Sequence, residues 1–220
     1  MTKDEIKRRI SEIGIVPVVR ASSPRDALIA VESVCKGGIR VVEITMTVPG
    51  AVEIIRELLK SHGPDVVVGA GTVLNAESAR RCLDAGAQFI VSPGLDLKTV
   101  ELVQKEGVLV IPGAFSPTEI ITAWNTGADF VKVFPCGNVG GPKYIKALKG
   151  PLPQIPLIPT GGVNLETAAD FILAGSEALG IGGELVQTAA IKAGKPEIVT
   201  EAARKFVEIV KKARAQIASA

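Results

Sequence analysis

Eight short apolar runs rich in β-branched residues recur along the chain at intervals of about 20 to 27 residues. Amphipathic stretches long enough for helices separate them, and this alternation is typical of parallel strands joined by helices. The runs are IVPVV from residue 15, RVVEI from 40, DVVVGAG from 65, QFIVS from 88, VLVIP from 108, DFVKVF from 129, IPLIPT from 155 and ALGIG from 178. The sequence therefore predicts a repeated strand and helix unit.

The number of repeats decides between two architectures. Eight units favour closure of the strands into a ring, and 220 residues lie near the lower size limit of an eight-fold barrel. A doubly wound open sheet usually has fewer strands and a GxGxxG loop after the first one, where this chain has ASSPRD. We therefore predict an α/β fold, a (β/α)8 TIM barrel formed by residues 1–220 as a single domain. A helix near residues 3–13 and a long helix near 196–217 are expected to close its ends.

The charge balance and the cysteines bear on compartment and partners. The chain has 25 basic and 23 acidic residues spread along its length, so no basic face for nucleic acid is expected. The charged start MTKDEIKRRI lacks an apolar signal core, and no apolar run approaches the ~20 residues of a membrane span. Cys35, Cys82 and Cys136 are odd in number and far apart, which is typical of reduced thiols. We expect a cytoplasmic protein with no nucleic-acid or membrane partner.

Polar residues at the carboxyl ends of the predicted strands are the candidates for function. In a barrel the active site lies at that end, and alternate strand residues point into the core. These candidates are Arg20, Glu43, Thr45, Thr72, Ser92, Lys132 and Thr160. Because nearly all come from different units, closure of the barrel would bring them to one face.

Lys132 is the candidate nucleophile. It lies in FVKVFP, where alternation places it on the interior face with Phe130 and Phe134. Desolvation there disfavours the ammonium, and the neutral amine can attack a carbonyl as a Schiff-base nucleophile. Alternation also turns Glu43 inward, where a carboxylate is placed to move the protons of imine and enamine chemistry. A purely structural ion pair of Glu43 with Lys132 or Arg20 is the alternative that the spacing leaves open.

Two glycine pairs follow the last two predicted strands. PTGGVN carries Gly161 and Gly162, and GIGGE carries Gly182 and Gly183. Barrels often bind phosphate between these two loops, because glycines let backbone N–H groups approach an anion at a helix N-terminus. Tight turns also use glycine, so each pair alone is a weak signal. Together they predict a phosphate cradle.

The sequence does not predict a histidine-dependent or metal-dependent site. His62 is the only histidine, and its HGPD turn precedes the third strand, at the opposite end of the barrel. One histidine and no clustered carboxylates provide no catalytic triad and no metal ligands. The imine serves as the electron sink in Schiff-base chemistry, so no cofactor is expected. Cys136, at the mouth of the sixth strand, is expected to fill space rather than react.

With these features the chain resembles the 2-keto-3-deoxy-6-phosphogluconate (KDPG) aldolase family, also known as 4-hydroxy-2-oxoglutarate (KHG) aldolases. The resemblance covers nearly the whole chain and rests on the ordered motifs VVEITMTVPGA, VGAGTVLN, GAQFIVSPGLD, IPGAFSPTE, VKVFP, GPKYIKALKGPLP and PTGGVN. It implies that Lys132 is the Schiff-base lysine and Glu43 the general acid and base. It further implies that Thr72 and Arg20 hold the pyruvate carboxylate and that Pro93 lines that end of the pocket.

The resemblance also assigns the distal part of the substrate. Thr160 matches a position that senses the C4 hydroxyl, where galactonate-specific relatives tend to carry an aliphatic residue, so the gluconate substrate is favoured. The phosphate cradle would be formed by Gly161, Gly162, Gly182 and Gly183. Two positions depart from the pattern: some members have arginine at Thr47, and others have serine at Gly183. The missing hydroxyl leaves a non-phosphorylated or broader substrate range open.

Our leading hypothesis is a class I aldolase that cleaves 2-dehydro-3-deoxy-6-phosphogluconate to pyruvate and glyceraldehyde 3-phosphate, and also acts on 4-hydroxy-2-oxoglutarate. Its partners would be keto-acid and aldehyde substrates, and the resemblance implies a homotrimer. The alternatives are a 2-dehydro-3-deoxy-6-phosphogalactonate aldolase, a phosphosugar isomerase or epimerase on the same barrel, and an engineered self-assembling scaffold derived from an aldolase trimer. Borohydride trapping with pyruvate would separate an aldolase from an isomerase, and sizing would reveal a cage.

Overall fold

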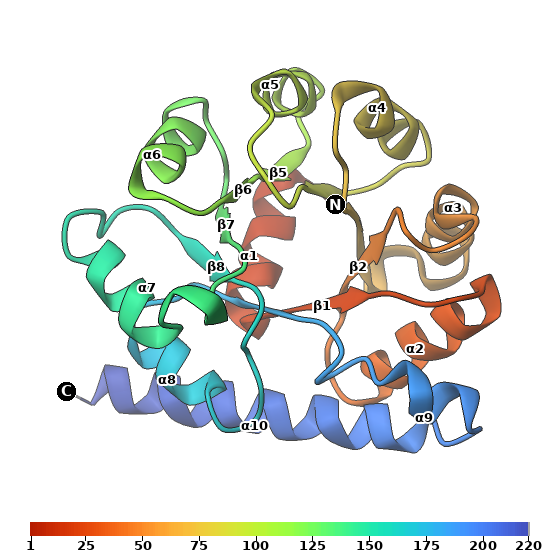
Figure 1. The fold of residues 1–220 in the computed structure, drawn as a ribbon. Coiled ribbons are helices and arrows are strands. Elements are labelled where there is room, and N and C mark those ends of the chain that lie inside the picture. Colours follow the sequence, from red (N-terminus) through yellow and green to blue (C-terminus); the bar gives the residue numbers. More distant parts are fainter. Residues whose placement is uncertain (220) are drawn as a thin grey trace.

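The computed structural model describes residues 1–219, in which strands and helices alternate (Figure 1). The strands are β1 (Ile15–Val19), β2 (Val41–Thr45), β3 (Val67–Gly71), β4 (Phe89–Val91), β5 (Leu109–Ile111), β6 (Gly113–Ala114), β7 (Val131–Val133), β8 (Leu157–Pro159) and β9 (Leu179–Ile181). The α-helices are α1 (Lys3–Ile13), α2 (Pro24–Lys36), α3 (Ala51–His62), α4 (Ala76–Asp84), α5 (Leu97–Lys105), α6 (Pro117–Asn125), α7 (Pro142–Lys149), α8 (Ala168–Leu173), α9 (Thr188–Lys192) and α10 (Glu197–Ala218). Two 3-10 helices are η1 (Gly63–Asp65) and η2 (Gly137–Val139). Each of the eight predicted runs contains a strand.

The strands are parallel and follow the order of the chain. One sheet has the order β5-β4-β3-β2-β1-β9, and a second has the order β6-β7-β8. A parallel bridge between Thr160 and Gly180 joins the end of β8 to β9. A doubly wound sheet would reverse this order at a switch point, and within residues 1–219 no reversal occurs. The chain is therefore an α/β fold whose parallel sheet is curled, with helices along its outer side (Figure 1).

A second short strand, β6, follows the fifth predicted run, and Pro112 separates it from β5. β5 pairs with β4, whereas β6 pairs with β7. Proline has no N–H to donate to a strand ladder, but the Pro112 carbonyl accepts the Lys132 N–H at 2.9 Å. Gly113 is consequently in register with Lys132, and the carboxyl end of this segment lies beside β7.

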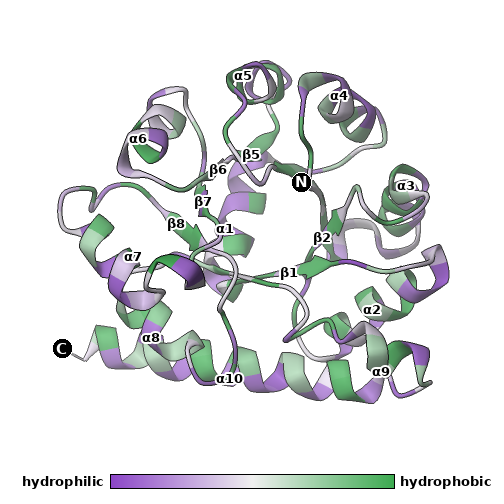
Figure 2. Ribbon diagram, in the orientation of Figure 1, coloured by the Kyte–Doolittle hydropathy of each residue, from purple (hydrophilic) through white to green (hydrophobic). Residues whose placement is uncertain are grey.

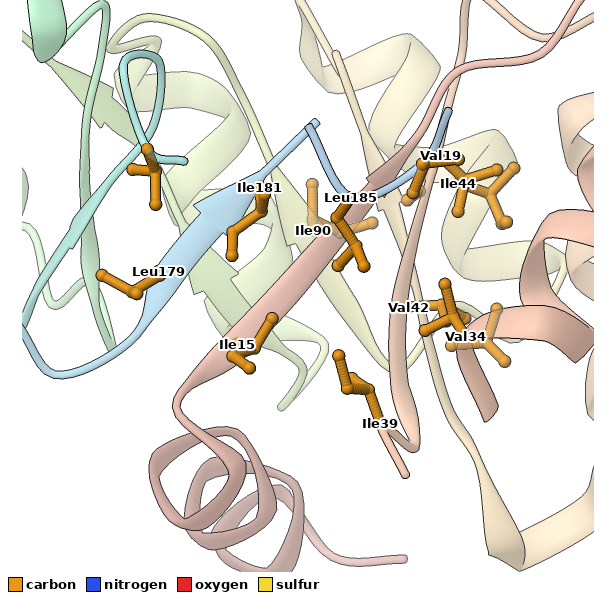
Figure 3. Packing of buried hydrophobic residues seen from close by; sticks show 14 of the residues in the cluster. Ile15, Val19, Val34, Ile39, Val42, Ile44, Ile90, Leu179, Ile181 and Leu185 are labelled. Atoms are coloured by element: carbon orange, nitrogen blue, oxygen red, sulfur yellow. The ribbon is translucent and has the colours of Figure 1, made fainter. Parts of the chain in front are cut away.

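Apolar side chains form two clusters, one on each side of the strands. On the outer side, residues of β1, β2 and β9 pack together with Val34 of α2 (Figure 3). On the inner side a smaller cluster joins two isoleucines of α1 to residues in the strands or directly before them: Ile6, Ile10, Val16, Val41, Val67, Phe89, Val91, Leu109, Ile111, Phe130, Ile158 and Ala178. Period-two alternation along each strand produces both clusters from one set of runs.

The predicted first and last helices are confirmed as α1 and α10. Lys3 of α1 pairs with the largely buried Asp129, with Nζ 2.9 Å from Oδ2, and Asp129 also accepts the Val110 N–H. The Arg214 side chain of α10 donates to the carbonyl oxygens of Glu12 and Glu177. These contacts hold α1 against the amino ends of the strands, where β7 and β9 begin.

Hydropathy alternates along the surface helices. Figure 2 shows hydrophilic and hydrophobic bands in turn along α10, as expected for a helix that buries one face. Among the described helices, none has a stretch both long and apolar enough to cross a bilayer.

Candidate active site

Lys132 lies in the middle of β7, in register with Gly113 of β6 and Ile158 of β8. Only 3% of the residue is exposed, in agreement with the predicted inward orientation. Its Nζ atom lies over the Phe134 ring, 5.3 Å from the centroid, within the range of a cation–π contact. The strand thus delivers one amine to the interior of the sheet.

Glu43 lies on β2, in register with Val18 and Gly69, and is 2% exposed. Burial raises the pKa of its carboxyl group, although the positive charges of Lys132 and Arg20 act in the opposite direction. Among the described residues its Oε1 atom has no hydrogen-bond partner. A buried, unpartnered carboxylate oxygen is costly, which makes it a candidate for a functional role.

Gly71 makes room for this carboxylate. The Glu43 side chain occupies the space that a Cβ atom on Gly71 would need. Gly71 therefore leaves space for a side chain of the neighbouring strand β2, because any side chain at position 71 would displace Glu43.

Lys132 and Glu43 line one small interior cavity of about 10 Å³, close to the smallest space that holds one water molecule. The remaining lining comes from Val16, Val91, Ile111, Ile158, Thr160 and Gly180. The structure thus brings together the two residues that the sequence predicted as catalytic.

A second cavity, of about 140 Å³, lies beyond the first toward the carboxyl ends of the strands, and we call it the glycine-lined cavity. Its lining comprises Val18, Arg20, Phe134, Thr160, Gly161, Gly162, Val163, Gly180, Gly182, Gly183 and Glu184. Thr160 and Gly180 line both cavities. Thr160 is held by its N–H bond to the Val133 carbonyl and packs where a side chain on Gly180 would lie. All four predicted cradle glycines therefore surround one space next to the lysine.

The glycine loops differ from the prediction in one respect: no helix begins directly behind them. α8 starts at Ala168 and α9 at Thr188, and these helices have only six and five residues. After Gly162, Asn164 Oδ1 accepts the backbone N–H groups of Glu166 and Thr167 and so forms a turn of its own. After β9, the Gly182 carbonyl accepts two N–H groups of the following turn. The prediction that a helix N-terminus lies at the cradle is thus wrong.

Thr72 and Arg20, which were predicted to hold the pyruvate carboxylate, and Pro93, which was predicted to line that end of the pocket, do not line one cavity. Arg20 lines the glycine-lined cavity, where a Cβ on Gly182 would lie 3.8 Å from its Nη1 atom, whereas Thr72 and Pro93 do not. Thr72 directly follows β3 and has a φ of 56°, which is rare for a β-branched residue and typical of strain at functional positions. The Pro93 backbone contacts Gly113, where a Cβ has no room.

Other predicted positions have structural partners. Thr45 donates to the Val19 carbonyl and lies 2.7 Å from the Thr47 hydroxyl, while Ser92 donates to the Gly94 carbonyl. Burial raises the pKa of the Cys136 thiol to about 12, which fits the expected space-filling role.

The prediction missed Glu184. It follows Gly183 directly, so its place beside the cradle was a signal in the sequence. His62 ends α3, where the only hydrogen bond of its ring within the described chain is with Ser61. Across residues 1–219 no group of three His, Cys, Asp or Glu side chains is placed to hold a metal ion.

Comparisons with known proteins agree on one family. The family model "KDPG and KHG aldolase" matches residues 6–202. A 2-dehydro-3-deoxy-phosphogluconate aldolase of Haemophilus influenzae is 34% identical over 96% of this chain and 99% of its own length. A 2-dehydro-3-deoxy-6-phosphogalactonate aldolase of Escherichia coli is 34% identical, over 80% of this chain and 85% of the relative.

A crystal structure of KDPG aldolase from Legionella pneumophila, with pyruvate captured at low pH as a covalent carbinolamine intermediate, has the same fold. It is 30% identical, covers 91% of this chain and 97% of its own, and gives a TM-score of 0.85. Sequence, fold and the paired interior lysine and glutamate therefore lead to one conclusion: this chain belongs to the KDPG and KHG aldolase family.

Proposed function

We propose that the protein is a class I aldolase that cleaves 2-dehydro-3-deoxy-6-phosphogluconate to pyruvate and glyceraldehyde 3-phosphate, and that it also acts on 4-hydroxy-2-oxoglutarate. The observation that carries this proposal is the pair of buried groups, Lys132 and Glu43, lining one cavity that adjoins the glycine-lined cavity. The carbinolamine in the Legionella relative supports amine chemistry on pyruvate in this family.

Lys132 would act first. Its neutral amine attacks the C2 carbonyl, and loss of water from the carbinolamine gives a protonated imine. The imine withdraws electrons from the C3–C4 bond, so this bond breaks when the C4 hydroxyl gives up its proton. The aldehyde leaves, and the remaining enamine carries the electron pair at C3. No cofactor is required, because the imine nitrogen takes up the electrons.

Glu43 would move the protons. Its carboxylate accepts the C4 hydroxyl proton, through a water, as the C3–C4 bond breaks, and its carboxyl then protonates C3 of the enamine. Hydrolysis of the resulting imine releases pyruvate and returns the amine of Lys132. A raised pKa suits the carboxyl group to both steps, since a weaker acid is a stronger base when it accepts the proton and still carries that proton to C3.

The other lining residues would bind the ends of the substrate. We propose that Arg20 contacts the distal group together with the N–H groups of Gly161, Gly162, Gly182 and Gly183, because it lines their cavity. Thr72 would bind the pyruvate carboxylate and Pro93 would line that end of the pocket. This end would then carry less positive charge than in family members with arginine at the position of Thr47. Thr160, between the two cavities, would contact the C4 hydroxyl and favour the gluconate over the galactonate epimer.

We further propose that the strands close into a complete (β/α)8 barrel, that residues 1–220 form one domain, and that the protein is a homotrimer. The Thr160–Gly180 bridge and the bond from Asp129 N–H to the Val110 carbonyl, 3.0 Å long, support closure on both sides of the smaller sheet. Light scattering should then give a mass three times that of one chain, whereas a cage would be far larger. The cytoplasmic location stays a prediction from the sequence.

The decisive experiment is borohydride reduction in the presence of pyruvate. The protein should gain the mass of one reduced pyruvate adduct per chain, and Lys132→Ala should lose both the adduct and cleavage of the phosphorylated acid. Lys149→Ala is the matched control, because this half-buried lysine donates to backbone carbonyls away from both cavities. An adduct on Lys132→Ala would show that another amine is the nucleophile, and no adduct on the unmodified protein would favour an isomerase.

A further inference from the structure

Glu184 is one of the residues that line the glycine-lined cavity. It is exposed and follows Gly183 in the turn after β9. Arg20 is the cation in the same lining. Within the described chain these two residues form no ion pair with each other or with a third residue, so both charges remain available to a ligand.

The charge of this lining does not suit a phosphate monoester. Such a group carries about −1.5 to −2 at neutral pH, whereas one arginine and one glutamate give a lining with no net charge. Gly183 offers no hydroxyl donor. The two helices after the loops are short and begin several residues beyond the glycines, so they add little to the binding of an anion.

The same lining suits hydroxyl groups. A carboxylate accepts hydrogen bonds from hydroxyls, and the guanidinium of Arg20 donates to their oxygens. Among the described residues, the Gly162 and Gly183 N–H groups form no hydrogen bond, so they can donate to a ligand as well. Carboxylate, guanidinium and backbone donors around one small space match a chain of neutral carbons that each carry a hydroxyl.

We propose that Glu184 is a specificity residue that directs this site toward unphosphorylated 2-keto-3-deoxy sugar acids. The inference rests on the proposed aldolase function and concerns only the end of the substrate remote from the lysine. The 6-phosphorylated acid remains a substrate, but it binds against the repulsion of Glu184. The neutral acid gains a hydrogen-bond acceptor at the same position.

The test compares kcat/KM for 2-keto-3-deoxygluconate with and without the 6-phosphate. Glu184→Gln keeps the size of the side chain but removes its charge, so it should raise kcat/KM for the phosphorylated acid roughly ten-fold and lower it for the neutral acid. Glu57→Gln removes one charge from an exposed position on α3 and is the matched control. It should change neither value.

Salt dependence provides a second measurement. The glycine-lined cavity of Glu184→Gln has a net positive charge, so its kcat/KM for the phosphorylated acid should fall more steeply with ionic strength than that of the unmodified protein. Equal changes for both substrates, or an unaltered ratio with unaltered salt dependence, would overturn the role of Glu184.

Pyruvate trapping separates this inference from the proposed function. Pyruvate has no distal end, so its borohydride adduct should form equally in Glu184→Gln and in the unmodified protein. If the adduct and cleavage are present but the ratio of the two substrates does not respond to Glu184, only the specificity inference fails. If neither acid is cleaved and no adduct forms, the aldolase function itself is wrong and the inference falls with it.

Discussion

At the scale of single residues, the proposed catalytic role of Glu43 can be separated from its effect on stability. Its carboxyl group is buried and its pKa is raised, yet it lines the same cavity as Lys132. Substitution by glutamine keeps its shape and one hydrogen-bonding oxygen while removing both the proposed proton transfer and the charge. Activity and stability should therefore change in opposite directions.

Glu43→Gln should slow turnover by roughly 10²- to 10⁴-fold, since general acid and base catalysis is lost. The adduct of Lys132 with pyruvate should still form, although more slowly, because the amine is retained. Single-turnover cleavage and borohydride trapping measured on the same preparation would check both statements. Undiminished turnover would assign the proton transfers to another group.

The same substitution should raise thermal stability, and the gain should depend on pH. Because the folded pKa of Glu43 lies above its unfolded value, stability is highest below the ordinary glutamate pKa and falls as pH rises through the folded pKa. The raised pKa is a net result, because it already includes the opposing attraction of the Glu43 carboxylate to Lys132 and Arg20. Glutamine does not titrate, so the Tm difference between variant and parent should grow from acid to neutral pH, by about 2–4 °C for each kcal/mol. A constant difference would contradict the raised pKa.

At the scale of structural elements, the two glycine loops differ in whether a side chain could be added to them. Gly162 has a φ of 78° and its Cβ would contact the Gly137 backbone at 2.6 Å, whereas a Cβ on Gly183 meets nothing within 4 Å. Gly162→Ala should therefore cost roughly 1–3 kcal/mol of stability and weaken substrate binding. Gly183→Ser should fold like the parent and raise kcat/KM for the phosphorylated acid several-fold, because it adds a hydroxyl donor. Thermal unfolding and steady-state kinetics would check the pair, and an equal loss of stability in both would refute the difference.

The sequence predicted where the helices and strands lie along the chain better than it predicted which of them are neighbours in space. Period-two alternation located the strands and turned Lys132 and Glu43 inward, because both properties depend on local spacing. The division at Pro112 depends on which strand receives each hydrogen bond, and pairing between distant segments leaves no local signal. The family resemblance grouped Arg20 with Thr72, and their ligands stay a prediction. The pairing of β1 with β9, which brings Arg20 near Gly182, likewise has no local signal in the sequence.

For the whole molecule, closure at the amino ends of the strands depends on α1. Lys3 pairs with Asp129, which precedes β7 and also accepts the Val110 N–H of β5. Lys3→Ala should leave this largely buried carboxylate with one partner fewer and lower stability by about 1 kcal/mol, or a Tm decrease of about 2–4 °C. Lys36→Ala, which removes an exposed contact with Glu32, is the control and should have no effect. Equal Tm values for both variants would show that α1 is held by its apolar contacts alone.

The contact between Glu43 and Gly71 also restricts the order in which this protein can evolve. The carboxylate fills the space above the glycine, so Gly71 cannot acquire a side chain while Glu43 is present. A shorter residue at position 43 would have to come first, and that step removes the proposed proton carrier. Gly71→Ala should accordingly be harmful in the parent and tolerated in a Glu43→Ala background. An active lineage would therefore retain Gly71 because Glu43 on the neighbouring strand needs the space. We expect glycine at position 71 and glutamate at position 43 to be retained together or replaced together.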